Sequence, residues 1–293
     1  PVSKNQELTA TVTDLTYQGM GVVKVDGYTL FCDDALPGEE IRLHVLKVGK
    51  NYGYAKVIER LTTSKDRVES QGKAYSQTGI APLQHLAYPA QLKFKQKQIQ
   101  DLLKKAHLDD IEVAETIGMK DPFHYRNKAQ FPVGMDKNGR LIAGFYAGRT
   151  HTIIENRDCA LGVAENKIVL DIVLDFCTEK KIPAYDETTG KGLLRHVLIR
   201  TGHVTGQIMV VLVLASPILP SKNNFVKALL KLHPEITTVV INVNNRNTSM
   251  VLGDKEHVIY GKGYIEDELC GKRFRISPRS FYQVNPVQTE ILY

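Results

Sequence analysis

Polar and apolar residues alternate through most of the first sixty positions, a period typical of β-strands. Short alternating runs follow one another between residues 7 and 60, and turn sequences such as Asp26-Gly27 and Pro37-Gly38 separate them. Asp-Gly between two such runs is a strong signal for a tight hairpin. Five short strands in this stretch predict a small, closed or nearly closed all-β barrel.

Beyond the barrel the pattern changes. Residues 61–84 are polar and lack a clear period, which predicts a linker or irregular loop. Residues 90–108 carry an apolar stripe at helical spacing, with lysines over the remaining surface, so we expect a helix there. Later segments mix strand-like runs with helical ones: strands over 125–133, 141–146, 193–200, 207–215 and 237–243, and helices over 163–180 and 223–232. This mixture predicts an α+β domain built largely from antiparallel hairpins.

The end of the sequence predicts one more helix. Asn285 is a favourable N-cap residue, and Pro286 suits the first helical position. Residues 287–293 are helical in character, and the sequence reaches Tyr293 without a glycine, a basic last turn or a breaker. We therefore expect the natural protein to continue beyond Tyr293.

Composition narrows the class of protein. The formal net charge is +6 and the isoelectric point is near 9.0, a balance that favours polyanionic partners. No apolar run approaches the roughly 20 residues that span a bilayer, and no signal peptide opens the sequence. Four widely separated cysteines lack metal-ligand spacing, which favours a reducing compartment. These features predict a cytoplasmic protein without a membrane partner.

Two groups of side chains are candidates for contact with RNA. Lys47, Lys50 and Tyr52 mix cations with an aromatic ring at a turn of the expected barrel, which suits phosphates and base stacking. A solvated rim is the alternative for this group.

The second group lies in the α+β region. Arg126 and Lys128 alternate on one face of an expected strand, and Arg195 and Arg200 lie on a neighbouring hairpin run. Together they predict a positive sheet face for phosphates. Ion pairing at the surface is the alternative.

Several segments carry a resemblance to a known family. Residues 7–60 resemble a TRAM domain, the small OB-like RNA-binding barrel of RNA-modifying enzymes. Other segments resemble, in the same order, the RNA uracil-C5 methyltransferases, and above all their bacterial 23S ribosomal RNA branch. These segments are Pro82-Leu83-Gln84-His85-Leu86-Ala87-Tyr88, Tyr125-Arg126-Asn127-Lys128-Ala129-Gln130, Gly144-Phe145-Tyr146, Arg149-Thr150-His151, Asp158-Cys159 and Ile276-Ser277-Pro278-Arg279-Ser280-Phe281-Tyr282-Gln283-Val284-Asn285.

The resemblance implies a multidomain architecture. Residues 1–62 would form the TRAM barrel, and residues 63–270 a central α+β RNA-binding domain. Residues 271–293 would begin a C-terminal α/β, Rossmann-like methyltransferase domain, of which only the start is present. The helix near residues 90–108 would pack on that domain.

The resemblance also implies a chemistry. The family transfers a methyl group from S-adenosyl-L-methionine to uracil C5 after a cysteine adds to C6, and a glutamate serves as base. We expect both catalytic residues beyond Tyr293, so we assign none here and expect these 293 residues alone to be inactive. Gln283 matches a glutamine that contacts the methyl donor, and Phe281 matches the aromatic residue beside the flipped uracil. A strand-end hydrogen bond for Gln283 and core packing for Phe281 are the alternatives.

One family feature is missing. Many members hold a [4Fe–4S] cluster with four cysteines, and the matching positions here are Gly72, Thr78, Ala81 and Cys159. Because a cubane cluster needs four ligands, one thiolate cannot hold it. We therefore expect no iron–sulfur cluster and no other metal, and Cys159 as an ordinary buried thiol.

The resulting hypothesis is a cytoplasmic, monomeric enzyme that forms 5-methyluridine in 23S ribosomal RNA, with this chain supplying the RNA binding. Two alternatives stay open: a transfer RNA uracil-C5 methyltransferase, and a non-catalytic TRAM-type RNA-binding or assembly protein.

Overall fold

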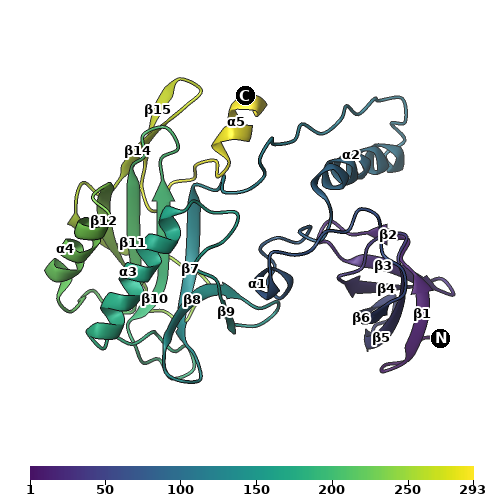
Figure 1. Cartoon of the computed structure of the whole chain (residues 1–293), viewed down its shortest axis with the longest axis horizontal. Helices are drawn as coiled ribbons and strands as arrows, with labels where there is room; N and C mark the ends of the chain where they lie inside the picture. The colour runs from purple at the N-terminus through teal and green to yellow at the C-terminus, as the bar shows by residue number, and fades with distance from the viewer. The chain divides into compact units, whose positions relative to one another are not determined.

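The computed structural model describes residues 1–293, apart from the side chain of Lys73. The chain divides into two compact units, Pro1–Gly118 and Met119–Tyr293. We call them the barrel unit and the sheet unit and describe each by itself (Figure 1). None of the helices in the described part of the chain has the length and apolarity to cross a bilayer.

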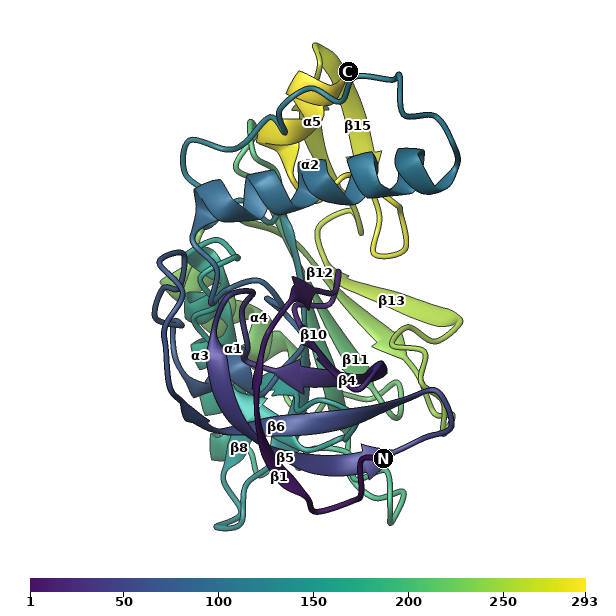
Figure 2. The same ribbon diagram turned by 90° about the vertical axis from the view of Figure 1, so that its right-hand side faces the viewer.

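The barrel unit contains a curled six-stranded sheet in the order β1-β5-β6-β4-β3-β2 (Figure 2). All neighbours in this order are antiparallel except β4 and β6, which are parallel. Its strands are β1 Glu7–Thr11, β2 Asp14–Leu15, β3 Gly21–Val25, β4 Tyr28–Asp33, β5 Glu40–Val48 and β6 Tyr52–Arg60. The expected all-β architecture is therefore confirmed, with the short β2 as a sixth strand.

The alternation in the sequence accounts for the core of this sheet. Every second residue of a strand points to the same side, and the inward residues form one buried cluster: Val12, Val23, Leu30, Cys32, Ala35, Ile41, Leu43, Val45 and Ala55. The predicted hairpin joins β3 to β4, and Asp26 and Gly27 adopt φ angles of 48° and 81°. Positive φ at both positions is the conformation that a two-residue turn of this type requires.

The polar segment after β6 is fastened to the barrel by a buried carboxylate. Glu39 is fully buried and accepts hydrogen bonds from the Arg67 side chain at 2.8 Å and from the backbone N–H groups of Leu36 at 2.8 Å and Ser64 at 3.1 Å. Burial disfavours the charged carboxylate, but these hydrogen bonds outweigh it and lower the pKa of Glu39 to about 2. Residues 63–118 thus belong to the same compact unit as the barrel, and the domain boundary expected at residues 62/63 stays a prediction.

Two helices follow in the barrel unit, α1 Lys73–Ser76 and α2 Tyr88–Lys105. The second confirms the helix expected near residues 90–108. An extended segment runs along it, since the Gln96 side chain donates to the carbonyl of Val113 at 3.0 Å and Thr116 donates to that of Leu92 at 2.9 Å.

The sheet unit is built on seven strands in the order β13-β12-β11-β10-β7-β8-β9. Only β11 and β12 are parallel, so the expected α+β domain dominated by antiparallel hairpins is confirmed. Its strands are β7 Lys128–Met135, β8 Leu141–Tyr146, β9 Ile153–Glu155, β10 Leu194–Thr201, β11 Ile208–Leu214, β12 Ile236–Val243 and β13 Lys255–Tyr260.

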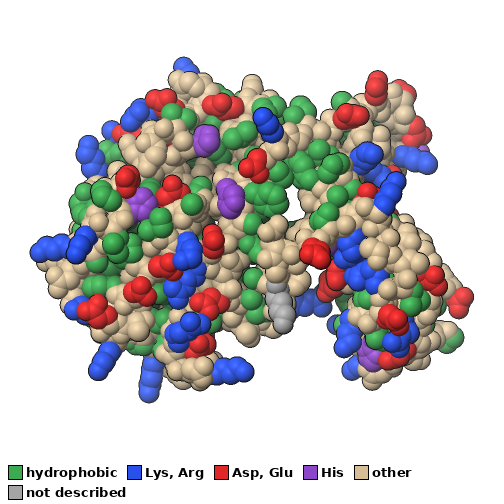
Figure 3. Space-filling view, viewed as in Figure 1, with side chains coloured by type: hydrophobic (Ala, Val, Ile, Leu, Met, Phe, Trp, Pro, Cys, Tyr) green, Lys and Arg blue, Asp and Glu red, His purple; other side chains and the backbone are tan. Residues whose placement is uncertain are grey.

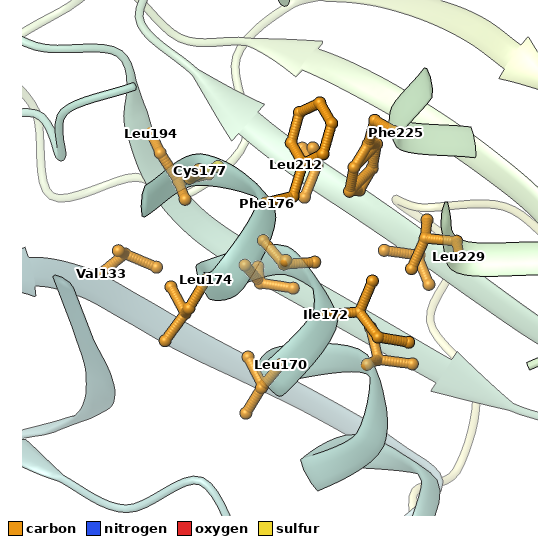
Figure 4. Close-up of a cluster of buried hydrophobic side chains, with 14 of the residues drawn as sticks. Val133, Leu170, Ile172, Leu174, Phe176, Cys177, Leu194, Leu212, Phe225 and Leu229 are labelled. Atoms are coloured by element: carbon orange, nitrogen blue, oxygen red, sulfur yellow. The ribbon is translucent and has the colours of Figure 1, made fainter. Parts of the chain in front are cut away.

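Two helices, α3 Glu165–Glu179 and α4 Lys222–Leu232, cover one face of this sheet (Figure 1). Phe176 of α3 and Phe225 of α4 meet with their ring centroids 5.2 Å apart, above the apolar side chains of the central strands (Figure 4). The hairpin of β14 Ile265–Leu269 and β15 Lys272–Ile276 contributes to a second apolar cluster with the opposite side of β10, β11 and β12. The sheet is therefore buried on both faces over its centre.

The end of the chain belongs to the sheet unit. The domain boundary expected at residues 270/271 coincides with the tip of the β14–β15 hairpin, within the sheet unit, and stays a prediction. The last helix, α5 Pro286–Leu292, begins as predicted, because the Asn285 side chain accepts a hydrogen bond from the N–H of Gln288 at 3.1 Å. Glu290 of α5 accepts from the N–H of Cys270 at 3.1 Å, which ties the helix to the hairpin tip.

Candidate nucleic-acid interface

Residues 277–285 form an irregular segment between β15 and α5, which we call the anchored loop. A turn closes its first half, where Ser277 and Ser280 exchange hydrogen bonds between side chain and backbone at 3.0 and 3.1 Å. Arg200 of β10 is 2% exposed, and its Nη1 donates to the carbonyls of Ser277 at 2.9 Å and Ser280 at 2.6 Å. A loop without ladder partners needs such donors, because buried carbonyls without hydrogen bonds are costly.

A second anchor holds the middle of the loop. Asn127, just before β7, donates from its side chain to the carbonyl of Gln283 at 2.9 Å and from its backbone to the carbonyl of Val284 at 3.0 Å. The same residue accepts from the N–H of Thr201 at 2.9 Å, so it joins the loop to two strands of the sheet. The backbone on both sides of Phe281 is therefore fixed.

A third anchor lies in the interior. Tyr282 is buried, and its hydroxyl donates to the Asp267 carboxylate at 3.3 Å. Asp267 is itself buried and accepts from the N–H groups of His203 at 3.0 Å and Val204 at 2.9 Å. Burial, together with the neighbouring negative charge of Asp267, raises the pKa of Tyr282.

The anchors leave one large side chain in solvent. Phe281 is 87% exposed although it stands between Ser280 and Tyr282, whose contacts fix the backbone. Within this chain Phe281 is therefore not part of a core, and its role stays a prediction. An exposed ring on a fixed backbone loses little conformational freedom when a flat ligand stacks on it.

Gln283 lies half-buried two residues further along. Its Nε2 donates to the Tyr293 hydroxyl at 3.2 Å, so its amide contacts a side chain at the end of α5. Within the described residues its Oε1 has no partner, which leaves an acceptor for a ligand with hydroxyl or amino donors.

Cations cluster where β7 begins, beside Asn127. Lys128 lies opposite Arg200 in the register of β7 and β10, and the exposed Arg126 donates from Nε to the Lys128 carbonyl at 3.0 Å. Burial, followed by the charges of Arg200 and Arg126, lowers the pKa of Lys128. In the described part of the chain, none of these three cations is paired with a carboxylate. An anion would relieve their mutual repulsion.

Two of the predicted cations do not face solvent. Arg195 is 4% exposed and donates to the carbonyls of Asn244 at 2.8 Å and Arg246 at 2.7 Å, with its guanidinium 4.2 Å above the Tyr185 ring. Arg195 and Arg200 are thus bound to irregular backbone segments that cover the sheet. The prediction that these two arginines form an exposed phosphate-binding face is wrong, because strand alternation does not show which segment covers a face.

The barrel candidates are placed as expected. Lys47 and Lys50 are exposed at the turn between β5 and β6, and Tyr52, which opens β6, is 48% exposed. Their role in RNA binding stays a prediction. Figure 3 shows Lys and Arg side chains intermixed with Asp and Glu on the side in view, so net charge alone does not mark an interface.

Four positions of this chain match the cysteine ligands of the iron–sulfur cluster in the family that the sequence resembles, and one of them is a cysteine. Gly72, Thr78 and Ala81 offer no thiolate, and Cys159 is a half-buried free thiol rather than the fully buried one expected. Among the described residues, no group of three or more His, Cys, Asp or Glu is arranged to hold a metal ion. The absence of an iron–sulfur cluster stays a prediction.

Sequence patterns missed the residues that shape the site. Asn127 and Asp267 contribute two of the three anchors, and neither belongs to a spacing that predicts it. The only signal for Asn127 is its place in the segment that resembles the methyltransferases.

Comparisons with known proteins show what the chain is similar to. Residues 1–58 match the TRAM domain family, which confirms the expected TRAM barrel. Over its whole length the chain is similar to RNA methyltransferases: it is 46% identical over 294 residues to an uncharacterized RNA methyltransferase of Halalkalibacterium halodurans and 43% identical over 292 residues to one of Listeria monocytogenes serotype 4b. The chain spans 64% of the length of each of these relatives.

A solved structure shares the fold. It is the Pyrococcus abyssi tRNA (uracil-54, C5)-methyltransferase in complex with S-adenosyl-L-homocysteine, with a TM-score of 0.74 and 23% identity. The match covers 97% of this chain and 63% of the archaeal one.

Proposed function

We propose that this chain is the RNA-binding portion of an S-adenosyl-L-methionine-dependent RNA uracil-C5 methyltransferase. Phe281 carries the proposal, since a large aromatic ring stands 87% exposed on a loop that three separate anchors fix. An enzyme that acts on a base within folded RNA must extrude it from the stack, and the extruded base needs a stacking surface. Phe281 supplies that surface, and the Arg126–Lys128 cluster supplies charge for the phosphates.

Gln283 is proposed to contact the methyl donor. The similarity to methyltransferases implies S-adenosyl-L-methionine, which supplies the methyl group. An amide with a free acceptor oxygen fits the hydroxyl and amino donors of such a cofactor. Since Gln283 and Phe281 share one fixed loop, the cofactor and the base would be positioned by the same backbone.

The covalent steps are proposed to use residues outside this chain. Uracil C5 becomes nucleophilic once a thiolate adds to C6, and a base must later remove the C5 proton so that the thiolate leaves. We expect the cysteine and the glutamate for these steps in the part of the relatives that the chain does not span. The 293 residues alone are then expected to bind RNA without methylating it.

The proposed substrate is 23S ribosomal RNA, which follows the resemblance of the motifs to that branch of the family. A cytoplasmic location and a monomeric state also stay predictions. Transfer RNA is the second candidate, since the archaeal enzyme of similar fold acts, by its name, on tRNA.

The test uses the full-length gene product with S-adenosyl-L-methionine labelled in its methyl group. We expect transfer to 23S rRNA transcripts and none to tRNA transcripts. Phe281→Ala should lower kcat/KM for RNA by about tenfold or more, because stacking on an aromatic residue contributes roughly 1–3 kcal/mol per base. Phe281→Tyr, which keeps the ring, should retain most activity.

Tyr17→Ala is the matched control, because Tyr17 is 73% exposed in the barrel unit, outside the anchored loop. If only tRNA transcripts were methylated, tRNA rather than 23S rRNA would be the substrate. Equal activity of Phe281→Ala and the wild type would remove the stated role of the ring, and no uracil methylation of any RNA would overturn the proposed function.

A further inference from the structure

Asn127 joins two parts of the sheet unit that the proposed function uses separately. Its neighbours in sequence are the cations Arg126 and Lys128, whereas its own side chain reaches the anchored loop, 156 positions later in the chain. Asn127 is 5% exposed, Arg126 is exposed and Lys128 is half-buried. Successive residues of an extended chain point to opposite sides. The two cations and the amide therefore act on opposite sides of one backbone segment.

The contacts of Asn127 hold the part of the anchored loop that carries Gln283. Its Nδ2 donates to the Gln283 carbonyl at 2.9 Å, and its backbone N–H donates to the carbonyl of Val284 at 3.0 Å. Its own carbonyl accepts from the N–H of Thr201 at 2.9 Å, which ties the same segment to β10. A shift of Asn127 therefore moves the backbone from which the Gln283 side chain extends.

Like charges crowd the other side of this segment. Lys128 lies opposite Arg200 in the register of β7 and β10, and the Arg126 guanidinium donates to the Lys128 carbonyl at 3.0 Å. Burial first, and then the charges of Arg200 and Arg126, lower the pKa of Lys128. An anion bound by Arg126 and Lys128 would offset this repulsion and favour the close pairing of β7 with β10 beside Asn127.

Asn242 of β12 is a buried asparagine without such neighbours. It is fully buried, donates to the carbonyl of Gly253 at 3.1 Å and accepts from the N–H of Gly253 at 2.7 Å, so it fastens an irregular segment to the sheet. Its sequence neighbours, Ile241 and Val243, pack in the apolar cluster beneath α3 and α4. Asn127 fastens the anchored loop in the same way, but it does so between two cations.

We propose that Asn127 is a positioning residue that couples RNA to the methyl donor. A phosphate bound by Arg126 and Lys128 fixes Asn127, and Asn127 fixes the backbone of Gln283 for the donor. The inference rests on the proposed function and adds a thermodynamic link between its two ligands. A segment that the first ligand has ordered costs less to order for the second, so each ligand tightens the binding of the other by the same factor.

The experiment measures this coupling factor with the full-length protein. The probes are S-adenosyl-L-homocysteine, which has no methyl group to transfer, and the RNA transcript that the wild type methylates. Isothermal titration calorimetry gives the Kd of S-adenosyl-L-homocysteine with and without saturating RNA. We expect RNA to lower this Kd about tenfold in the wild type, within the usual range of coupling between sites.

Asn127→Ala should remove the coupling and spare the separate affinities. The Kd of each ligand alone should stay within about twofold of the wild type, since Gln283, Arg126 and Lys128 remain, and the coupling factor should fall to about twofold or less. Lys128→Gln should lower the factor to a similar value. The Asn127→Ala/Lys128→Gln double variant should lower it no further, because both residues lie on one path.

Asn242→Ala is the matched control, because it removes a buried amide of the same kind from the same sheet. It should lower the thermal stability about as much as Asn127→Ala does and keep the wild-type coupling factor. This comparison separates coupling from stability, since a residue that only stabilises the fold would not change the factor. Should Asn127→Ala not fold, Lys128→Gln tests the link by itself, and a wild-type factor in that variant would contradict it.

Three results would overturn the inference. One is a wild type in which RNA leaves the Kd of S-adenosyl-L-homocysteine unchanged. Another is an Asn127→Ala variant that keeps the wild-type factor. The third is an Asn127→Ala variant that binds S-adenosyl-L-homocysteine more weakly by the same ratio with and without RNA, which would assign Asn127 to stability alone. Any of these, with uracil methylation by the wild type intact, leaves the proposed function standing. A wild type that methylates no RNA uracil overturns both.

Discussion

Both units of this protein hold arginine side chains in protected positions, but the acceptors differ. In the barrel unit, Arg67 is bound to the buried carboxylate of Glu39. In the sheet unit, Arg200 is bound to the backbone carbonyls of the anchored loop. The first arrangement joins two charges and therefore titrates with acid. The second joins a charge to neutral dipoles, and burial lowers the pKa of Arg200 only to about 10, so it stays protonated at neutral pH.

The difference teaches how each unit fixes an irregular segment. The barrel unit fastens the chain after β6 through Glu39, which forms ion pairs with Arg60 and Arg67 and accepts from two backbone N–H groups. The sheet unit divides the same task among Arg200, Asn127 and the Tyr282–Asp267 pair. A single buried carboxylate concentrates the stabilisation in one group, whereas three anchors spread it.

The largest expected effect is therefore that of Glu39→Gln. It removes the buried carboxylate that Arg60 and Arg67 share and leaves Arg67 with the exposed carboxylate of Asp34. We expect a loss of about 3 kcal/mol, the lower end of the range for breaking a buried pair. Urea denaturation of the 293-residue chain, followed by far-ultraviolet circular dichroism, measures the loss. Glu59→Gln is the control, because Glu59 pairs with Arg42 at the surface and should contribute less than about 1 kcal/mol. Equal losses for the two variants would contradict the concentration of stability in Glu39.

The next largest effect is expected at low pH, which should destabilise the barrel unit before the sheet unit. The folded pKa of Glu39 is about 2, below its ordinary value of 4.5, so its stabilisation is present above about pH 4.5 and is lost as the pH falls toward 2. Residue-resolved amide hydrogen exchange across this range should show the barrel unit losing protection before the anchored loop. In Glu39→Gln the barrel should lose most of this pH dependence, and an unchanged acid profile in that variant would assign the transition to other carboxylates.

Arg200→Met should have a smaller effect, about 2–3 kcal/mol, because it leaves carbonyls of the anchored loop without their donor while Asn127 and Tyr282 still hold. Arg126→Gln should change stability by less than about 0.5 kcal/mol, since Arg126 is exposed. Thermal unfolding compares the two variants. If Arg126→Gln proved the more destabilising of the pair, the assignment of Arg200 as an anchor would be wrong.

Sequence patterns predicted the regular elements because they have a period. Alternation predicted the barrel, Asp26-Gly27 predicted its hairpin, and Asn285-Pro286 predicted the start of α5. The β14–β15 hairpin was missed, and a domain boundary was placed in its turn. β15 exposes four of its five residues, and in β14 the acidic Asp267 occupies a buried position where an apolar residue would mark a strand.

The candidate site was predicted only in part. Phe281 and Gln283 were identified through a motif, and the exposure of Phe281 agrees with a role in stacking. Asn127 and Asp267 were missed because the sequence around a single polar residue does not show which distant backbone group it will hydrogen-bond. Arg195 and Arg200 were assigned to solvent for the same reason, although the alternation that placed them on a strand was correct.

The amino-acid order by itself thus determined most of the strands and helices, the alternation of side chains along those strands, and the chemical character of the motifs. Only the tertiary structure decided which of those sides meet solvent, because burial depends on segments distant in sequence that fold over a face. Arg200 shows this directly, since the carbonyls that bind it come from residues 77 to 80 positions later in the chain. The hydrophobic period depends on residues that are close in sequence, whereas the burial of a sheet face depends on segments that are far apart in sequence.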